Sequence, residues 1–230
     1  MFNLAVRTAV QFNSKLFFMP FFYQQNINDT NHLAIWAIRE PLSFFEEDMQ
    51  LPIPIQNEER RIQHLAVRLL FKLMMPEVDL ADLILADNGK PYLKGVPFHF
   101  SFSHCKGYAA CAVCDKSPIG IDIELMHPRI LKVAHKFLND KEKDLLVGLT
   151  EEATLHQLAF FWAAKEAMYK QHEQLGIDFS RDFYVPKLAT NKQGSLLAFV
   201  LHKEENKEEN KEVTLDYHFG DDYVAVTCYM

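Results

Sequence analysis

The segment Gly120-Ile-Asp-Ile-Glu124 decides how the rest of the sequence is interpreted. Side chains alternate along a β-strand, so Asp122 and Glu124 project from one face while the isoleucines project from the other. Two carboxylates this close repel each other unless something positive lies between them. Because oxygen ligands suit a hard divalent cation such as Mg²⁺, one interpretation is a metal site. The alternative is an exposed edge strand whose acids are solvated.

A second segment, Phe160-Phe-Trp-Ala-Ala-Lys-Glu-Ala-Met-Tyr-Lys170, begins 40 residues after Gly120 and predicts a packed helix. Glu166 and Lys170 are four residues apart and therefore share a helix face. They could be an ordinary surface ion pair, worth ~0.3–0.5 kcal/mol. However, a Glu and a Lys within a largely apolar helix indicate more than a solvated pair. Three carboxylates and a lysine could together bind a metal-bound polyphosphate.

Outward from these segments, strand-like and helix-like patterns fill both halves of the 230-residue chain and predict an α+β fold. The expected helices are 42–49, 57–74, 139–147 and 150–175, and the expected strands are 5–12, 15–23, 32–39, 98–104, 108–114, 119–124, 184–189, 196–202, 213–219 and 223–229. Lys116-Ser-Pro118 is the expected linker, near the middle of the chain. The Lys/Glu tract 203–212 is expected to be a solvated hairpin tip or a mobile loop.

Two elements have a clear periodicity. In residues 57–74 the apolar side chains recur with helical spacing, and the basic side chains Arg60, Arg61, His64 and Arg68 are expected on a solvated face. In residues 98–104 the phenylalanines alternate with His99, Ser101 and Ser103, so the strand should have one aromatic and one polar face.

Composition excludes several classes of protein. The chain has 24 Lys and Arg against 31 Asp and Glu, a net charge of −7, which argues against non-specific nucleic-acid binding. The longest apolar run, 16–23, contains Pro20 and is far shorter than the ~20 residues that span a bilayer, so no membrane segment is expected. No signal-peptide cleavage pattern follows it. The sequence has only four cysteines, and we expect them to be reduced and the protein to be cytoplasmic.

The two quoted segments, in this order, resemble the signature of the 4′-phosphopantetheinyl transferases. Upstream, Asn88-Gly-Lys-Pro91 resembles a turn of that family, and Phe102-Ser-His104 resembles a strand motif. Phe137-Leu138 with Glu142 resembles a further family stretch. The length of the chain resembles the double-length, Sfp-type members rather than the short carrier-protein synthases.

The resemblance implies a pseudo-dimer of two similar α/β subdomains, with the active site in the cleft between them. Residues 1–115 would hold the adenine and 3′-phosphate of coenzyme A, and residues 116–230 would hold the metal and the catalytic side chains. The implied enzyme is a Mg²⁺-dependent transferase with holo-[acyl-carrier-protein] synthase activity. It moves phosphopantetheine from coenzyme A to a conserved serine of an apo acyl or peptidyl carrier protein, giving holo carrier and 3′,5′-ADP.

By matching position, the resemblance implies that Asp122, Glu124 and Glu166 hold Mg²⁺, with Mn²⁺ as an alternative ion. Glu166 would also be the general base, and Lys170 would contact the pyrophosphate, so the expected catalytic set is Asp122, Glu166 and Lys170. Trp162 is interpreted as packing. Lys165 is about 100° around the helix from Glu166 and could pair with an acid elsewhere.

The implied coenzyme A contacts lie upstream. Ser103 and His104 would bind its phosphates, with His104 at the 3′-phosphate. Gly89, Lys90 and Pro91 would line the adenine end. Arg61 is the expected further phosphate partner, and Arg60 is its competitor, because the alignment of a helix face can slip.

The expected protein partner is the carrier, and a monomer without membrane or nucleic-acid partners is expected. Carriers for fatty-acid, polyketide and nonribosomal peptide biosynthesis all fit. Carrier proteins are acidic, so a basic surface should receive them, and the basic residues after Glu124 are one docking candidate; a solvated helical face is the alternative. This candidate surface comprises Arg129, Lys132, Lys136, Lys141 and Lys143. Two other functions stay open: a silent carrier-binding module, and a Mg²⁺-dependent pyrophosphatase acting on coenzyme A.

Overall fold

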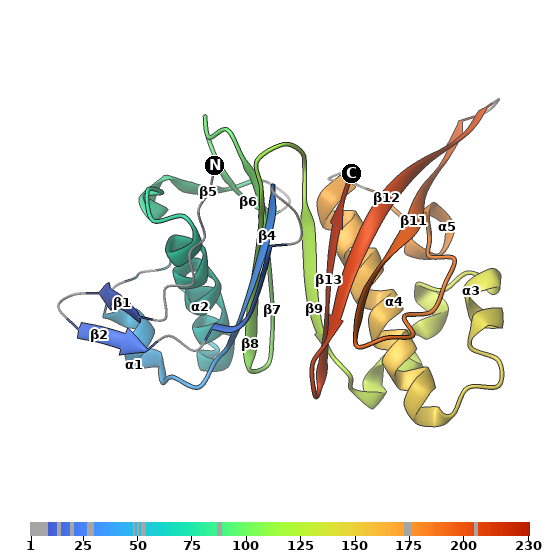
Figure 1. Cartoon of the computed structure of the whole chain (residues 1–230), viewed down its shortest axis with the longest axis horizontal. Coiled ribbons are helices and arrows are strands. Elements are labelled where there is room, and N and C mark those ends of the chain that lie inside the picture. Colours follow the sequence, from blue (N-terminus) through green and yellow to red (C-terminus); the bar gives the residue numbers. More distant parts are fainter. Residues whose placement is uncertain are drawn as a thin grey trace.

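The computed structural model describes residues 9–12, 15–18, 21–26, 30–47, 49, 51, 54–86, 89–172, 176–204 and 207–230. These residues form a mixed helix and sheet structure, which confirms the expected α+β class. Two larger antiparallel sheets dominate it, and each has one long helix packed against its outer face (Figure 1). Two small two-stranded pairs, β1 with β2 and β5 with β6, complete the described sheets.

The first large sheet has the strand order β3-β4-β8-β7. Its strands are β3 Phe21–Asn26, β4 Asn31–Ala37, β7 His99–Cys105 and β8 Tyr108–Cys114. Helix α2, Glu58–Met74, packs on one face and begins at Asn57, whose side chain accepts the Arg60 amide. The aromatic face of β7 turns toward this helix, where Phe71 stacks on Phe100 with ring centroids 4.6 Å apart. The alternation predicted for this strand is therefore confirmed.

The second large sheet has the strand order β10-β11-β12-β13-β9. Its strands are β9 Gly120–Leu125, β10 Phe183–Tyr184, β11 Gln193–Glu204, β12 Lys207–Phe219 and β13 Tyr223–Tyr229. Helix α4, Glu151–His172, packs against β9 and β13. Its many alanines allow the close approach, and the core below it includes Phe160, Phe161 and Val226.

The two sheets face each other across a shared apolar layer (Figure 1). This layer joins Ile35 and Ala110 of the first sheet to Ile121 and Ile123 of the second. Strands β4 and β8 are consequently covered on both faces, by α2 and by the second sheet, and all their residues are buried. The order of layers is helix, sheet, sheet, helix, with β7 beside β9 at the contact.

The remaining elements are short. They are α1 Leu42–Glu46, α3 Asp140–Leu145, α5 Phe179–Asp182, β1 Ala9–Phe12, β2 Lys15–Phe18, β5 Leu83–Leu85 and β6 Pro91–Leu93. Between β9 and α3 the chain forms two 3₁₀ turns, Pro128–Lys132 and Ala134–Lys136. All four cysteines are unpaired, as expected. Among the described residues, no helix is both long enough and apolar enough to cross a membrane.

Three element predictions are wrong in extent. The strand predicted at 184–189 ends at Tyr184, because the next amide, of Val185, bonds to the carboxylate of Glu142 instead of a neighbouring strand. The strand predicted at 15–23 is two strands in different sheets. The helix predicted at 42–49 ends at Glu46. By contrast, the Lys/Glu tract extends the β11–β12 hairpin, which is one of its two predicted forms. Residues 5–8, 19–20 and 173–175 of the predicted elements, and Asn88 of the quoted turn, lie outside the described residues.

Candidate active site

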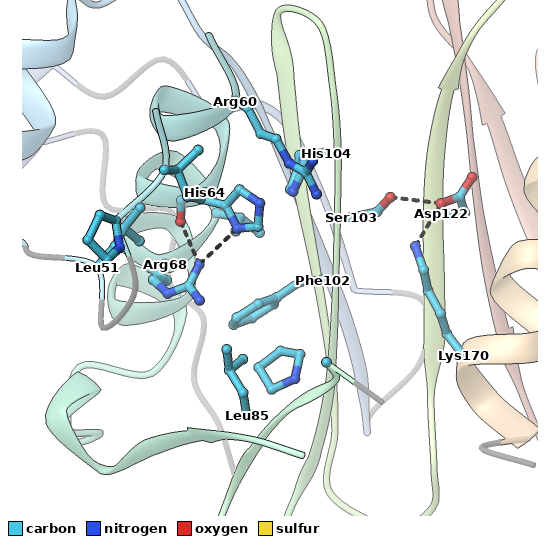
Figure 2. Close-up of a pocket in the computed structure, with 15 residues that line it drawn as sticks. Leu51, Arg60, His64, Arg68, Leu85, Phe102, Ser103, His104, Asp122 and Lys170 are labelled. Atoms are coloured by element: carbon cyan, nitrogen blue, oxygen red, sulfur yellow. Dashed lines mark hydrogen bonds and ion pairs between the residues drawn. The ribbon is translucent and has the colours of Figure 1, made fainter. Parts of the chain in front are cut away.

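A pocket of about 620 Å³ opens where the two sheets meet. Figure 2 shows that its lining comes from both halves: α2 and β7 on one side, β9 and α4 on the other. The polar lining residues are Arg60, His64, Arg68, Ser103, His104, Asp122 and Lys170. A smaller pocket of about 250 Å³ adjoins it and adds Lys90, Glu166 and Tyr169. Most of the sequence-predicted site residues are thus brought together.

Asp122 lies at the centre of the contact between the halves. Its residue is only 6% exposed, and its Oδ1 accepts from Lys170 Nζ at 2.7 Å and from Ser103 Oγ at 2.8 Å (Figure 2). Lys170 also donates to the Ile121 carbonyl at 2.9 Å. Gly120 makes this geometry possible, because a Cβ there would lie 1.9 Å from the Ala167 carbonyl oxygen of α4. The glycine that opens the motif lets helix and strand touch.

The two glutamates of the motif lie in a poorly solvated environment. Burial, with the neighbouring Asp122 carboxylate, raises the pKa of Glu166 to about 7, while Lys170 acts in the opposite direction. Burial and Asp122 likewise raise the pKa of Glu124 to about 7, while the Leu125 backbone and the Trp162 side chain act in the opposite direction. Both carboxylates therefore change charge near neutral pH, as expected of groups that handle protons or cations.

The carboxylate oxygens of Asp122, Glu124 and Glu166 are chemically suitable ligands for a hard divalent cation. Burial raises the pKa values of Glu124 and Glu166, repulsion by Asp122 adds to the shift, and a divalent cation would relieve that repulsion. As they stand, no three His, Cys, Asp or Glu side chains of the described residues converge in a ligand geometry. Asp122 is instead neutralised by Lys170.

The opposite wall of the pocket is basic. His104 lies against His64, with ring centroids 4.5 Å apart, and its Nδ1 is 3.0 Å from Gln63 Oε1. Burial, His64, Lys170 and the arginines lower the pKa of His104 to about 3. Burial and nearby arginines lower the pKa of His64 to about 4. Burial is the largest cause of both shifts, and the positive charges of the neighbouring arginines add to it. Positive side chains gathered around a pocket stabilise a bound anion.

The solvated face predicted for α2 is wrong at its centre. Arg68 is 8% exposed, and its Nη1 donates to the His64 carbonyl at 2.9 Å. Among the described residues, no carboxylate pairs with it. A guanidinium is rarely buried without an anionic partner, so Arg68 is a candidate functional residue that sequence reasoning missed. The only available signal was its place on the same helix face as His64, four residues earlier.

Arg60 and Arg61, the two arginines of α2 considered as phosphate partners, have different surroundings. Arg60 lines the large pocket. Arg61 forms an ion pair with Glu46, outside the set of lining residues. Gly89 and Pro91 line both pockets, and Lys90 Nζ donates to the Lys170 carbonyl at 3.1 Å. The predicted adenine-side turn therefore lines both pockets and contacts α4 at Lys170.

Lys165 pairs with an acidic residue, Glu142, as its position on the helix suggested. It is fully buried, and its Nζ bonds to Glu142 Oε2 at 2.6 Å and to the carbonyls of Phe137, Phe179 and Phe183. Glu142 also closes a capping box with Asn139 at the start of α3. This network fixes α4 against the segments around it, and so holds Glu166 and Lys170 in place. Trp162 packs on Phe137 as expected, and its side chain counteracts the rise in the pKa of Glu124.

Comparison with known proteins agrees with the motifs. Residues 118–228 match the model of the 4′-phosphopantetheinyl transferase superfamily. The chain is 35% identical over 113 residues to the 4′-phosphopantetheinyl transferase psf-1 of Bacillus pumilus, which covers 47% of the chain and 46% of that protein. It is 30% identical over 123 residues to the 4′-phosphopantetheinyl transferase Sfp of Bacillus subtilis (strain 168), covering 52% of the chain and 54% of Sfp.

A further 4′-phosphopantetheinyl transferase of Bacillus subtilis is 37% identical over 84 residues, covering 36% of the chain and 37% of that protein. The chain thus spans about half the length, or less, of the curated relatives it matches. The matched family region contains the whole acidic motif and the α4 motif. Over residues 118–228, just under half of its length, the chain is thus similar to the 4′-phosphopantetheinyl transferase superfamily.

Proposed function

We propose that this protein transfers phosphopantetheine from coenzyme A to a serine of an apo carrier protein. The observation that carries the proposal is the pocket itself, in which Asp122 of β9 and Lys170 of α4 face the basic residues of α2 and His104 of β7, with Glu166 of α4 in the adjoining pocket. A polyanionic substrate such as coenzyme A could bind along the basic wall, with its pyrophosphate beside the acidic motif. The match of residues 118–228 to the 4′-phosphopantetheinyl transferase superfamily supports the same chemistry.

Glu166 is the proposed general base. With a pKa of about 7, it is partly ionised at neutral pH and can take the proton from the carrier serine hydroxyl. The serine oxygen then forms a bond to the β-phosphorus of coenzyme A as the bond to 3′,5′-ADP breaks. Lys170, 25% exposed at its side chain, can balance the charge that develops on the departing phosphate.

Asp122, Glu124 and Glu166 are the residues that would hold Mg²⁺, or Mn²⁺ in its place. When bound, such an ion supplies charge neutralisation at phosphate oxygens. The protein's own contribution is to keep the three carboxylates near one another in a partly buried site, which Gly120 and the Lys165 network achieve through the packing of α4 on β9.

The proposed contacts to phosphate are residues of the pocket wall that α2 and β7 form. We assign Arg60, His104 and Arg68 to the 3′-phosphate side, and Arg60 replaces Arg61 in that role because only Arg60 lines the pocket. Gly89, Lys90 and Pro91 remain the proposed adenine side.

Replacing Arg60 with alanine should raise KM for coenzyme A by about 10-fold or more, because a charge-assisted hydrogen bond to phosphate contributes ~1.5–3 kcal/mol. Arg61→Ala is the matched control: it removes the same charge one residue away and should change KM less than about twofold. Steady-state kinetics at saturating carrier would measure both. A larger effect at Arg61 than at Arg60 would reverse the assignment.

The two halves, residues 1–115 and 116–230, are proposed to be two similar subdomains of a pseudo-dimer with the active site in the cleft between them. We also propose a cytoplasmic monomer. The carrier would dock on the basic stretch after β9, where Leu131, 51% exposed, lies between Arg129 and Lys132. An exposed apolar side chain flanked by cations suits a partner with acidic and apolar surface.

Incubation with coenzyme A, Mg²⁺ and an apo carrier tests the proposal directly. The carrier should gain one phosphopantetheine group by intact-protein mass spectrometry, and the gain should be absent without Mg²⁺. A carrier-binding module would bind carrier without changing its mass. If fatty-acid, polyketide and peptide-synthetase carriers all keep their original mass, the proposal is wrong.

A further inference from the structure

The hydroxyl of Ser103 is fully engaged by the opposite half of the molecule. Its Oγ accepts the Ile123 amide of β9 at 3.2 Å and donates to Asp122 Oδ1 at 2.8 Å. The residue is 6% exposed. A hydroxyl carries a single proton, and here that proton goes to a carboxylate. Ser103 is therefore bonded in a way that leaves no donor for a phosphate oxygen.

Ser101 makes one of the two kinds of hydrogen bond that Ser103 makes. Its Oγ accepts the Ile121 amide at 3.1 Å, two residues earlier on both strands. The two serines of β7 thus take the place of a neighbouring strand along the edge of β9 that does not pair with β13. The difference is the carboxylate: among the described residues, Ser103 donates to Asp122 and Ser101 donates to no carboxylate.

Asp122 is consequently held from both sides. Lys170 reaches it from α4 and Ser103 reaches it from β7, and both donate to the same oxygen (Figure 2). In the proposed function Lys170 also serves the substrate phosphate, so its bond to Asp122 is available to be exchanged. Ser103 has no such second task. It is the donor that keeps the Asp122 carboxylate oriented when an anion draws Lys170 away.

We propose that Ser103 is a positioning residue that acts through Asp122, holding a metal-binding carboxylate of one half from the strand of the other. This inference rests on the proposed function and changes one part of it: Ser103 was expected to bind a phosphate of coenzyme A itself. Outer partners of metal-binding carboxylates commonly contribute about 10- to 100-fold to metal affinity or activity.

Mn²⁺ binding to the protein without coenzyme A tests the inference apart from catalysis. The free ion is counted by electron paramagnetic resonance during titration of the parent, Ser103→Ala and Ser101→Ala proteins. Ser103→Ala should raise the Kd for Mn²⁺ about 10-fold or more, and Ser101→Ala should stay within about twofold of the parent. Equal affinities in all three proteins, or equal losses in both variants, would overturn it.

Ser103→Cys keeps the size of the side chain but donates weakly, so its Kd should fall between those of the parent and Ser103→Ala. If the alanine variant does not fold, the cysteine variant alone decides: parental affinity overturns the inference, and weakened affinity supports it.

Kinetics separate the two roles considered for Ser103. A positioning role predicts that Ser103→Ala lowers kcat by about 10- to 100-fold with KM for coenzyme A within about twofold. A direct phosphate contact predicts a raised KM at unchanged kcat, and that result would overturn the inference. If the parent transfers nothing to any carrier, the proposed function fails, while the Mn²⁺ titration still decides whether Ser103 orients Asp122.

Discussion

Glu166→Gln should lower kcat by about 10²- to 10⁴-fold, the range expected when a general base is removed. The amide keeps the size of the side chain but cannot accept the serine proton. The loss should appear at saturating coenzyme A and carrier, because Glu166 is placed at the reacting atoms. Near-parental turnover would exclude Glu166 as the base.

The same substitution should make the metal-free protein more stable at high pH. In the unfolded chain the Glu166 carboxyl ionises near its usual pKa of 4.5, whereas in the folded protein its pKa is about 7. Between these values the unfolded chain releases a proton that the folded protein retains. The free energy of unfolding therefore falls as pH rises from about 4.5 to about 7, and stays lowered above it. Glutamine removes this penalty.

Urea unfolding in the presence of a chelator, at pH 5 and pH 8, measures the effect. The gain from Glu166→Gln should be larger at pH 8 than at pH 5. Glu152→Gln is the matched control, since Glu152 is exposed at the start of the same helix and should give no such difference. An equal change at both pH values would show that burial does not perturb Glu166.

Lys165→Met should have the largest effect on stability, lowering the free energy of unfolding by about 3–5 kcal/mol. Both members of the Lys165–Glu142 pair are fully buried, and the ammonium also serves three backbone carbonyls. Methionine would leave a buried carboxylate without its counter-ion and those carbonyls without their donor. Urea unfolding monitored by tryptophan fluorescence gives the value, and of the two tryptophans Trp162 packs on Phe137 within this network.

Lys143→Met is the control for that experiment. Lys143 pairs with Asp140 at 2.8 Å on the surface of α3, where the carboxylate side chain is 96% exposed. Solvent screens this pair, so its loss should not measurably change stability. If Lys165→Met were tolerated equally well, the network would not be what holds α4 in place.

The acidic half of the candidate site could be predicted from sequence, and most of the basic half could not. Asp122, Glu124 and Glu166 belong to short segments whose side-chain directions follow from strand and helix periodicity. The choice between Arg60 and Arg61 depends on the rotation of α2 over its sheet, because neighbouring helix residues differ by about 100° in direction. The contact with Glu46 of α1, which occupies Arg61, is tertiary.

The burial of Arg68 likewise depends on tertiary neighbours, which the pattern of the helix does not reveal. Its helix face is basic, which favours solvent, but Leu51 and Ile55, which come from outside the helix, line the same pocket as Arg68. Ser103 shows a second limit. The strand pattern placed its side chain on the polar face of β7, yet its hydroxyl bonds to Asp122, 19 residues later in the other half. Such pairings depend on how the two sheets meet, which local periodicity does not contain.

Release of 3′,5′-ADP from coenzyme A is the measurement that tests the central claim most directly. It is followed by chromatography in parallel mixtures with the apo carrier, with a carrier whose modified serine is alanine, and with no carrier. We predict release with the apo carrier only, at one molecule per carrier modified. Equal release in all three mixtures would reveal a hydrolase acting on coenzyme A, and no release with any apo carrier would contradict the transferase.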